Sequence, residues 1–370
     1  MLKSFRYVLF PFSIIYGIII WIRNKLFDWK VLKSVRFNFP IICIGNLAVG
    51  GTGKTPLTEL IVHQLQSTYN IATLSRGYKR KTKGFAIANE TTTALEIGDE
   101  PMQFHQKFPN IVVAVGEERL VAIPQILYQR PETAVIVLDD AFQHRSVLAG
   151  LNIILTDYHN LYTRDFMMPA GDLRDIASSS KRADIIIVTK CPSNLTQIER
   201  LKIEKELNLL PHQKCYFTCI QYNNPYHLFD KTVKILNEQD VALLLCGIAN
   251  PKPIMQYLTA QLQSYEMISY ADHHIFSSAD LQDIKLQYQA NVSANKIMIT
   301  TEKDAVRLIK FKNELSSFPI FVLPIQHQFL FESQSHFIES LTTFIESYPT
   351  QNNKSNIQSQ TTIADLKSNN

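Results

Sequence analysis

Residues 45–56 read Gly-Asn-Leu-Ala-Val-Gly-Gly-Thr-Gly-Lys-Thr-Pro, a glycine-rich segment that ends in a lysine and a hydroxyl residue. Glycines allow backbone N–H groups to curl around phosphate oxygens, a lysine reaches the β- and γ-phosphates, and the hydroxyl binds Mg²⁺. Ala48 stands where the usual pattern begins with glycine, and a glycine-rich turn without a ligand is the alternative. We predict a nucleotide-phosphate site that comprises Gly50, Gly51, Thr52, Gly53, Lys54 and Thr55.

An acidic pair, Asp139 and Asp140, directly follows the apolar run at residues 134–138. A carboxylate at the end of a buried strand is the arrangement that holds Mg²⁺ beside a phosphate-binding loop. A helix-capping aspartate is the alternative, which explains one acid more readily than two. We therefore predict Thr55, Asp139 and Asp140 as metal ligands.

Several apolar, β-branched runs supply the strands that would carry these residues. Nearly continuous hydrophobicity is typical of strands buried on both faces of a parallel sheet. Helical patterns at residues 55–67 and 117–129 lie between them. The alternation predicts a P-loop α/β domain with a doubly wound, mostly parallel sheet. The runs are residues 40–45, 71–75, 111–115, 134–138, 151–155 and 184–188.

Two later apolar runs, at residues 241–246 and 296–300, predict a second, smaller α/β lobe. The last 21 residues are rich in Asn, Gln, Ser and Thr, which is typical of a disordered tail. We divide the chain into four parts: a membrane-associated segment at 1–36, the nucleotide-binding domain at 37–225, the smaller lobe at 226–349 and the tail at 350–370.

Residues 7–22 contain no charged side chain and span about 24 Å as a helix, which is short for a bilayer core of about 30 Å. Residues 1–36 carry seven basic side chains and one acidic side chain, a balance that favours anionic lipid. An interfacial or re-entrant helix, a short tilted span, a cleaved signal peptide and a solvated basic helix are the alternatives. We prefer the interfacial or re-entrant helix, with the main body on the cytoplasmic side.

The composition of the chain also limits which binding partners and metals we expect. The net charge of +4 gives no indication of a nucleic-acid partner, and we infer no required protein partner. The five cysteines are odd in number and lie mostly in apolar surroundings, as buried thiols do in a reducing compartment. Cys215 and Cys219 have no second pair, so a zinc site is not expected.

Further motifs occur in a fixed order and, with the glycine-rich loop, resemble those of the tetraacyldisaccharide 4'-kinases. The resemblance runs from about residue 37 to 310. The motifs are Ser75-Arg76-Gly77-Tyr78, Gly98-Asp99-Glu100-Pro101, Asp139-Asp140 with Phe142-Gln143-His144, Pro169-Ala170-Gly171-Asp172-Leu173-Arg174, Gly247-Ile248-Ala249, Asp272-His273-His274 and Thr301-Glu302-Lys303-Asp304-Ala305.

The resemblance implies transfer of the ATP γ-phosphoryl group to the 4'-hydroxyl of an acylated glucosamine disaccharide 1-phosphate. The acceptor would lie in the cytoplasmic leaflet of the inner membrane. By resemblance, Asp99 and His273 activate the acceptor hydroxyl, while Lys54, Arg119 and Arg174 surround the reacting phosphates or substrate. The cofactors implied are ATP and Mg²⁺. Asp175 stands where relatives often have glutamate, so a shared role for it is doubtful.

Each motif also has a structural alternative. Asp99 suits the start of the helix expected near Pro101, and His273 with His274 would suit a metal except that adjacent side chains point apart. Residues 301–304 satisfy the capping-box pattern, which makes them architectural. We expect Asp99 and His273 to meet when the two lobes close on a substrate.

Three other functions compete. A membrane-positioning switch ATPase has a signature lysine where this chain has Val49. A GTPase requires a carboxylate after the Thr189-Lys190 pair, where this chain has Pro192. A non-catalytic lipid-binding protein does not require a phosphate loop together with two acids at the end of a strand.

Overall fold

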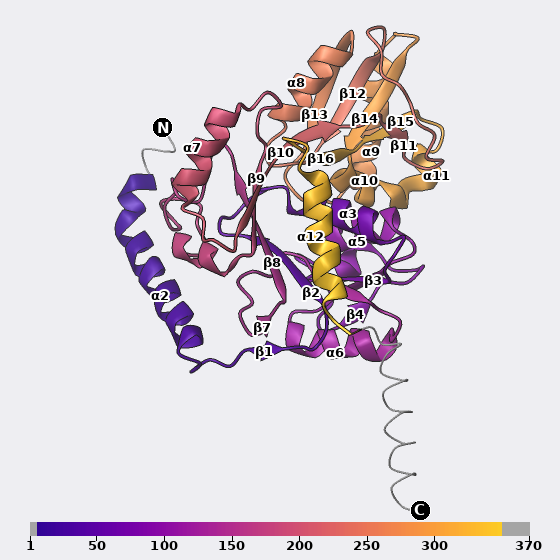
Figure 1. Ribbon diagram of the computed structural model, residues 1–370. Coiled ribbons are helices and arrows are strands. Elements are labelled where there is room, and N and C mark those ends of the chain that lie inside the picture. Colours follow the sequence, from indigo (N-terminus) through magenta and orange to yellow (C-terminus); the bar gives the residue numbers. More distant parts are fainter. Residues whose placement is uncertain (1–5, 350–370) are drawn as a thin grey trace, which may run out of the picture.

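The apolar runs of the first 190 residues form adjacent strands of one nine-stranded sheet in the computed structural model, which describes residues 6–349 (Figure 1). The strand order is β16-β10-β9-β8-β2-β6-β3-β5-β4. Only the outermost pairs, β16 with β10 and β4 with β5, are antiparallel. The strands are β2 (Ile41–Asn46), β3 (Ile71–Ser75), β4 (Ala86–Ile87), β5 (Val112–Val115), β6 (Val135–Leu138), β8 (Leu151–Asp157), β9 (Ile185–Thr189), β10 (Lys214–Tyr222) and β16 (Ile325–Phe329).

Helices cover both faces of this sheet. Every residue of β2, β3, β6 and β9 is buried, as continuous hydrophobicity predicts for central parallel strands. One core includes residues of α6 and α7, and the other includes residues of α3, α5 and α12. The predicted doubly wound P-loop fold is confirmed. The helices are α3 (Lys54–Leu65), α4 (Ala94–Ile97), α5 (Asp99–Lys107), α6 (Arg119–Gln129), η2 (Ala177–Arg182), α7 (Gln197–Leu207) and α12 (Gln334–Glu346).

A second sheet of five strands has the order β11-β15-β14-β12-β13, with only β11 antiparallel to its neighbour. Its strands are β11 (Tyr226–His227), β12 (Val241–Cys246), β13 (Ser264–Ser269), β14 (Lys296–Thr301) and β15 (Ile320–Leu323). Its helices are α8 (Lys252–Gln261), α9 (Ser278–Ala290), α10 (Glu302–Leu308), η3 (Ile309–Phe311) and α11 (Lys312–Leu315). The predicted strands at 241–246 and 296–300 are both present in this sheet.

After β15 the chain returns to the large sheet. Residues of β16 pair with β10, and Phe337, Leu341 and Ile345 of α12 enter the core beneath the large sheet. The prediction assigns residues 226–349 to the smaller lobe, but the strand and the helix after residue 323 belong with the large sheet. The sequence pattern failed here because a short strand and an amphipathic helix suit either sheet. The predicted tail at 350–370 lies outside the described residues.

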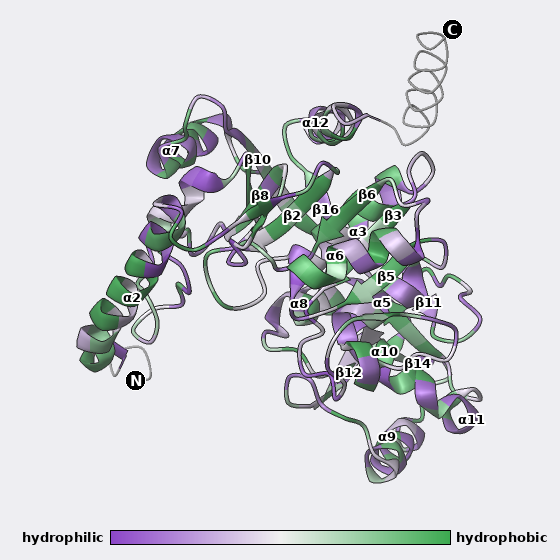
Figure 2. Ribbon diagram, turned by 90° about the horizontal axis from the view of Figure 1, so that it is seen from below, coloured by the Kyte–Doolittle hydropathy of each residue, from purple (hydrophilic) through white to green (hydrophobic). Residues whose placement is uncertain are grey.

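The N-terminal helix lies along one side of the large domain, away from the second sheet (Figures 1 and 2). A short turn, η1 (Tyr7–Leu9), leads into α2 (Phe10–Asp28). The helix is longer than the predicted run of residues 7–22, and its length and composition are sufficient to cross a membrane. It is followed by β1 (Val35–Arg36), which pairs in parallel with β7 (Val147–Leu148).

Helix α2 turns its polar side chains toward the domain and its apolar side chains outward, which is the reverse of an ordinary surface helix. Ser13 and Asn24 are buried against the domain, whereas its large apolar side chains face outward. Surface helices of globular proteins bury their apolar stripe instead. The exposed apolar residues of α2 are Phe10, Phe12, Ile14, Ile15, Ile18, Ile19, Trp21 and Ile22.

Candidate active site

The glycine-rich loop connects the carboxyl end of β2 to the first turn of α3. Gly50 and Gly53 have φ values of 102° and 89°, a left-handed conformation that glycine adopts without steric cost. Asn46 donates from Nδ2 to Thr52 Oγ1 at 3.0 Å, and Thr189 Oγ1 donates to the Thr52 carbonyl at 2.8 Å. The ends of β2 and β9 thus hold the loop in shape.

The loop leaves space on the side where phosphates would lie. A Cβ atom at Gly50 or Gly51 would meet no atom within 4 Å. The Lys54 side chain starts at the first residue of α3, and its Nζ lies 3.7 Å from Asp140 Oδ1. The open cradle, the lysine and the positive end of α3 fit the phosphates of a nucleotide.

Asp139 and Asp140 follow β6, next to β2, and have different surroundings. Asp139 is buried and accepts only two long hydrogen bonds, from Thr58 at 3.4 Å and Ser75 at 3.5 Å. Burial raises the pKa of Asp139, and the nearby charges of Glu100 and Asp140 raise it further. Such a carboxylate fits a divalent cation, which would supply the missing positive charge.

Arg174 and Lys54 engage Asp140. The Arg174 guanidinium forms a bidentate pair with the Asp140 carboxylate and also donates to Asn46 Oδ1 at 2.5 Å. Burial alone would raise the pKa of Asp140, but Lys54 and Arg174 outweigh it and lower the pKa. Of the two predicted acidic ligands, Asp139 is therefore the one without a cationic partner among the described residues.

Arg119 is the first residue of α6, which follows the carboxyl end of β5, two strands from β6 in the sheet. Its side chain is fully buried, and one nitrogen donates to the carbonyl of Gly116. Within residues 6–349 its Nε and second terminal nitrogen have no hydrogen-bond partner. Burial lowers the pKa of Arg119 to about 10, while the carboxylate of Asp139 opposes that shift. The structure thus brings Arg119 into the electrostatic surroundings of the metal-binding candidate.

Asp99 and His273 lie together although they come from different lobes. His273 Nδ1 is 2.8 Å from Asp99 Oδ2. Asp99 is the first residue of α5 with no capping role, since Gly98 occupies the N-cap position. His274 points elsewhere, toward Asp280 at 3.1 Å. Asp99 therefore begins α5, as the structural alternative expects, but makes no side-chain capping bond, and His273 and His274 turn toward different partners.

The smaller lobe also supplies Arg307 of α10 to this pair. Its Nε donates to Asp99 Oδ1 at 2.7 Å, and a terminal nitrogen donates to the other oxygen. On the neighbouring position of α5, Glu100 is surrounded by Lys54, Lys303, Asp140 and His273. Burial raises the pKa of Glu100, and the two lysines oppose this. The Asp99–His273 pair therefore shares one electrostatic neighbourhood with the phosphate-binding loop.

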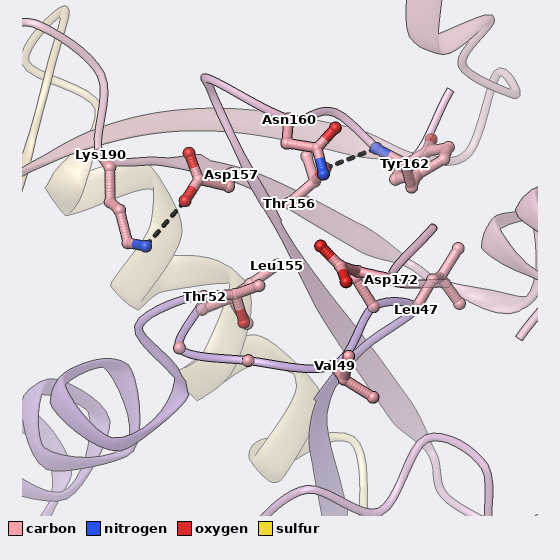
Figure 3. A pocket seen from close by; sticks show the side chains of 13 residues that line it. Leu47, Val49, Thr52, Leu155, Thr156, Asp157, Asn160, Tyr162, Asp172 and Lys190 are labelled. Atoms are coloured by element: carbon pink, nitrogen blue, oxygen red, sulfur yellow. Dashed lines mark hydrogen bonds and ion pairs between the residues drawn. The ribbon is translucent and has the colours of Figure 1, made fainter. Parts of the chain in front are cut away.

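A cavity of about 200 Å³ is lined by residues 47–52 of the loop and by residues at the ends of β8 and β9 (Figure 3). Lys190 and Asp157 form an ion pair at 2.7 Å in its wall, which Asp172 and Asn160 also line. The Asp172 carbonyl accepts from Val49 N at 2.7 Å, which ties the segment before Arg174 to the loop.

Sequence reasoning missed several residues of this site. His327 of β16 contacts the Gly53 carbonyl through Nε2 at 2.8 Å, which nothing in its local sequence indicates. Glu100, Lys303 and Arg307 lie in or beside motifs that the sequence singled out, but were given no chemical role. The i and i+4 spacing of Lys303 and Arg307 was an available signal, since it puts both cations on one helical face.

A phosphate-binding loop and an acidic pair at the end of a strand, on a doubly wound parallel sheet, define a P-loop phosphotransferase fold. Comparisons with known proteins narrow the class. A sequence profile of the family described as tetraacyldisaccharide-1-P 4'-kinase matches residues 5–346. The chain belongs to the tetraacyldisaccharide 4'-kinase family, and the predicted resemblance is confirmed.

Individual relatives support this assignment. A tetraacyldisaccharide 4'-kinase of Bacteroides thetaiotaomicron is 44% identical over 353 residues, covering 91% of this chain and 92% of the relative. One of Flavobacterium johnsoniae is 45% identical, covering 92% of this chain and 97% of the relative. The crystal structure of LpxK from Aquifex aeolicus in complex with ATP is similar at 26% identity and a TM-score of 0.72, covering 93% and 99% of the two chains.

Proposed function

We propose that this chain transfers the γ-phosphoryl group of ATP to the 4'-hydroxyl of a tetraacyl glucosamine disaccharide 1-phosphate. Membership of the family supports the reaction, and the observation that carries it is the meeting of Asp99 and His273 at 2.8 Å beside the phosphate-binding loop. A switch ATPase or a GTPase has no need for an acid and a histidine from two lobes aimed at an acceptor.

The transfer requires an acceptor oxygen, a transferring phosphoryl group and a leaving ADP. Asp99 takes the proton from the 4'-hydroxyl as its oxygen forms the new bond to the γ-phosphorus. The bond between the γ-phosphorus and the bridging oxygen breaks, and ADP leaves with that electron pair. His273 orients Asp99 through the hydrogen bond at Nδ1. A positioned base of this kind contributes about 10²–10⁴ in rate.

The remaining residues stabilise negative charge on the transferring group, which dominates phosphoryl transfer. Lys54 contacts the β- and γ-phosphates, and Arg119 offers its unpaired donors. Arg174 holds Asp140 and the end of β2 in place. Thr55 and Asp139 would hold Mg²⁺, with Asp140 beside them. The ion would neutralise the phosphate oxygens.

We also propose that α2 attaches the enzyme to the cytoplasmic face of the inner membrane. Its outward apolar side chains suit lipid, and its inward polar side chains bind the two segments that form the site. Tyr16 donates to the Arg174 carbonyl at 3.2 Å, and Arg23 donates to the Gln143 carbonyl at 2.9 Å. The acyl chains of the acceptor would remain in the bilayer while its sugars reach the site.

Acceptor-dependent ADP release tests the proposal. The purified chain in mixed micelles should release one ADP for each tetraacyl disaccharide 1-phosphate consumed, and negligible ADP when the acceptor is omitted. An acceptor with hydrogen in place of the 4'-hydroxyl is the matched control, because it binds but offers no nucleophile. Rapid ADP release that ignores the acceptor would contradict the proposal and favour a switch ATPase.

A further inference from the structure

Two cations on one face of α10 flank the Asp99–His273 pair. Lys303 and Arg307 are four residues apart, so their side chains project from successive turns of the helix. Arg307 contacts both oxygens of Asp99, as described above. Lys303 Nζ lies 3.2 Å from His273 Nε2, on the opposite side of the imidazole ring. The helix therefore contacts each member of the pair through a different cation.

The contact with Lys303 determines where the imidazole proton resides. An ammonium group only donates, so His273 Nε2 accepts from Lys303 and the ring proton lies on Nδ1, where Asp99 Oδ2 at 2.8 Å is a much nearer neighbour than the Arg307 nitrogen at 3.5 Å. Nδ1 faces Asp99 Oδ2, which accepts it. His273 is thus a neutral donor to Asp99, and the carboxylate keeps the negative charge that a base requires.

Lys303 also neutralises Asp272, the carboxylate that would otherwise favour a proton on His273 Nε2. Asp272 Oδ2 lies 3.8 Å from His273 Nε2, too far for a hydrogen bond but close enough to favour a second ring proton. The Lys303 ammonium holds the other oxygen of Asp272 at 2.6 Å and neutralises it. Without Lys303, Asp272 would attract a proton to Nε2, and the resulting imidazolium would weaken Asp99 as a base.

The position of α10 is well determined by contacts that do not involve the pair. Thr301 caps the helix by accepting from Asp304 N at 3.2 Å, and Asp304 in turn accepts from Gly247 N at 3.0 Å. Glu302 accepts from Lys107 of α5 at 2.6 Å. Thr301 therefore caps α10 as the pattern at residues 301–304 predicts, although the reciprocal bond of a full capping box is absent within residues 6–349, and this cap fixes the helix face that carries Lys303.

His273 itself adopts a left-handed backbone conformation with φ of 65°. Such a conformation is unfavourable for a residue other than glycine and persists only where surrounding contacts hold it. The charged or titratable groups that face His273 are Asp99 and Glu100 from α5, Lys303 and Arg307 from α10, Asp272 from its own loop and Tyr78 from the loop after β3.

We propose that Lys303 is a positioning residue that keeps His273 a neutral hydrogen-bond donor, so that Asp99 remains the base for phosphoryl transfer. The proposal rests on the proposed function for its catalytic consequence, but the protonation state of His273 can be measured without turnover. Lys303 acts through His273 and needs no contact with the substrate.

Selective ¹⁵N labelling of histidine tests the protonation state directly, with the His273→Gln variant identifying the signal. In the parent at neutral pH, the ring proton of His273 should lie on Nδ1, and Nε2 should carry none. In Lys303→Met at the same pH, a proton should appear on Nε2. Lys303→Arg should behave as the parent, because guanidinium also only donates. An unchanged Nε2 signal in Lys303→Met would overturn the proposal.

Turnover gives the second readout. Lys303→Met should lower kcat at least about tenfold, with KM for ATP unchanged within about twofold. Lys303→Arg should recover most of kcat, and Lys312→Met, at an exposed position on α11, is the control. Near-parent kcat in folded Lys303→Met would overturn the proposal. An inactive parent with the expected Nε2 signals would contradict the proposed function alone.

Discussion

His273 Nδ1 lies 2.8 Å from Asp99 Oδ2, although 174 residues separate them in the chain and they belong to different lobes. The contact forms because α10 of the smaller lobe packs against α5 of the larger one, where Lys107 bridges Glu59 and Glu302. The smaller lobe thus completes the site that the phosphate-binding loop begins.

Removing either member of this pair should remove the function of both. We expect Asp99→Ala and His273→Ala each to lower kcat by about 10²–10⁴, and the double variant to be little worse than the Asp99 variant. His336→Ala, at an exposed histidine in α12, is the control and should retain kcat. Steady-state kinetics at saturating ATP and acceptor measures these values. Losses that multiply would show that the residues act independently.

Lys54 should be required for turnover but not for folding. Its side chain lies in the open cradle beside Asp140 and packs against no core, so Lys54→Met should leave the circular dichroism spectrum unchanged. The negative charge of the transition state would lose the stabilisation that Lys54 supplies, and phosphoryl transfer should fall by at least about 10²-fold. Lys202→Met, an exposed lysine in α7, should transfer normally. Parent-like turnover in Lys54→Met would exclude the phosphate-loop assignment.

The outward face of α2 should determine membrane attachment. Burial of a large apolar side chain contributes about 1.5–3 kcal/mol before ordering costs, and Ile15 and Ile19 are both more than half exposed. We expect the double change Ile15→Glu and Ile19→Glu to release the protein from vesicles of anionic lipid. Ile198→Glu, at a more exposed isoleucine of α7, is the control. Sedimentation with vesicles measures this, and full retention of the double variant would refute it.

Much of the fold could be predicted because the residues with functional side chains come directly after buried strands in the sequence. The loop before Lys54, the pair at Asp139 and the strands that precede them are local patterns, and each appears where the sequence places it. The order of the motifs in the chain also identified the family.

Contacts between distant segments could not be predicted in the same way. His327 reaches the loop because β16 returns to the large sheet after the second sheet is complete, and no local pattern distinguishes that strand from another strand of the smaller lobe. The inward polar face of α2 also depends on partners more than 100 residues away, such as Asp175, which accepts from Asn24 at 2.8 Å.

His327 should make folding stability depend on pH. Burial lowers its pKa from 6.5 to about 4, and it stays neutral between Thr218 Oγ1 and the Gly53 carbonyl. Between those two values the unfolded chain binds a proton that the folded chain excludes, so stability falls as pH falls. The difference corresponds to about 3 kcal/mol, fully present above pH 6.5 and lost toward pH 4.

The His327→Gln variant should show a shallower loss of stability over this pH range. His144, whose pKa burial also lowers to about 4, would still contribute in the variant, so the dependence should shrink rather than vanish. Urea unfolding of both proteins at a series of pH values measures the slopes. Equal slopes would show that His327 is not held neutral in the folded chain.

Transfer of radiolabelled γ-phosphate from ATP to a tetraacyl disaccharide 1-phosphate in mixed micelles is the most direct measurement of the central claim. We predict that the label appears on the lipid, that analysis of the product places it at the 4'-position, and that Lys54→Met abolishes the transfer while Lys202→Met does not. Label that appears only as inorganic phosphate, or at another hydroxyl of the sugar, would contradict the account.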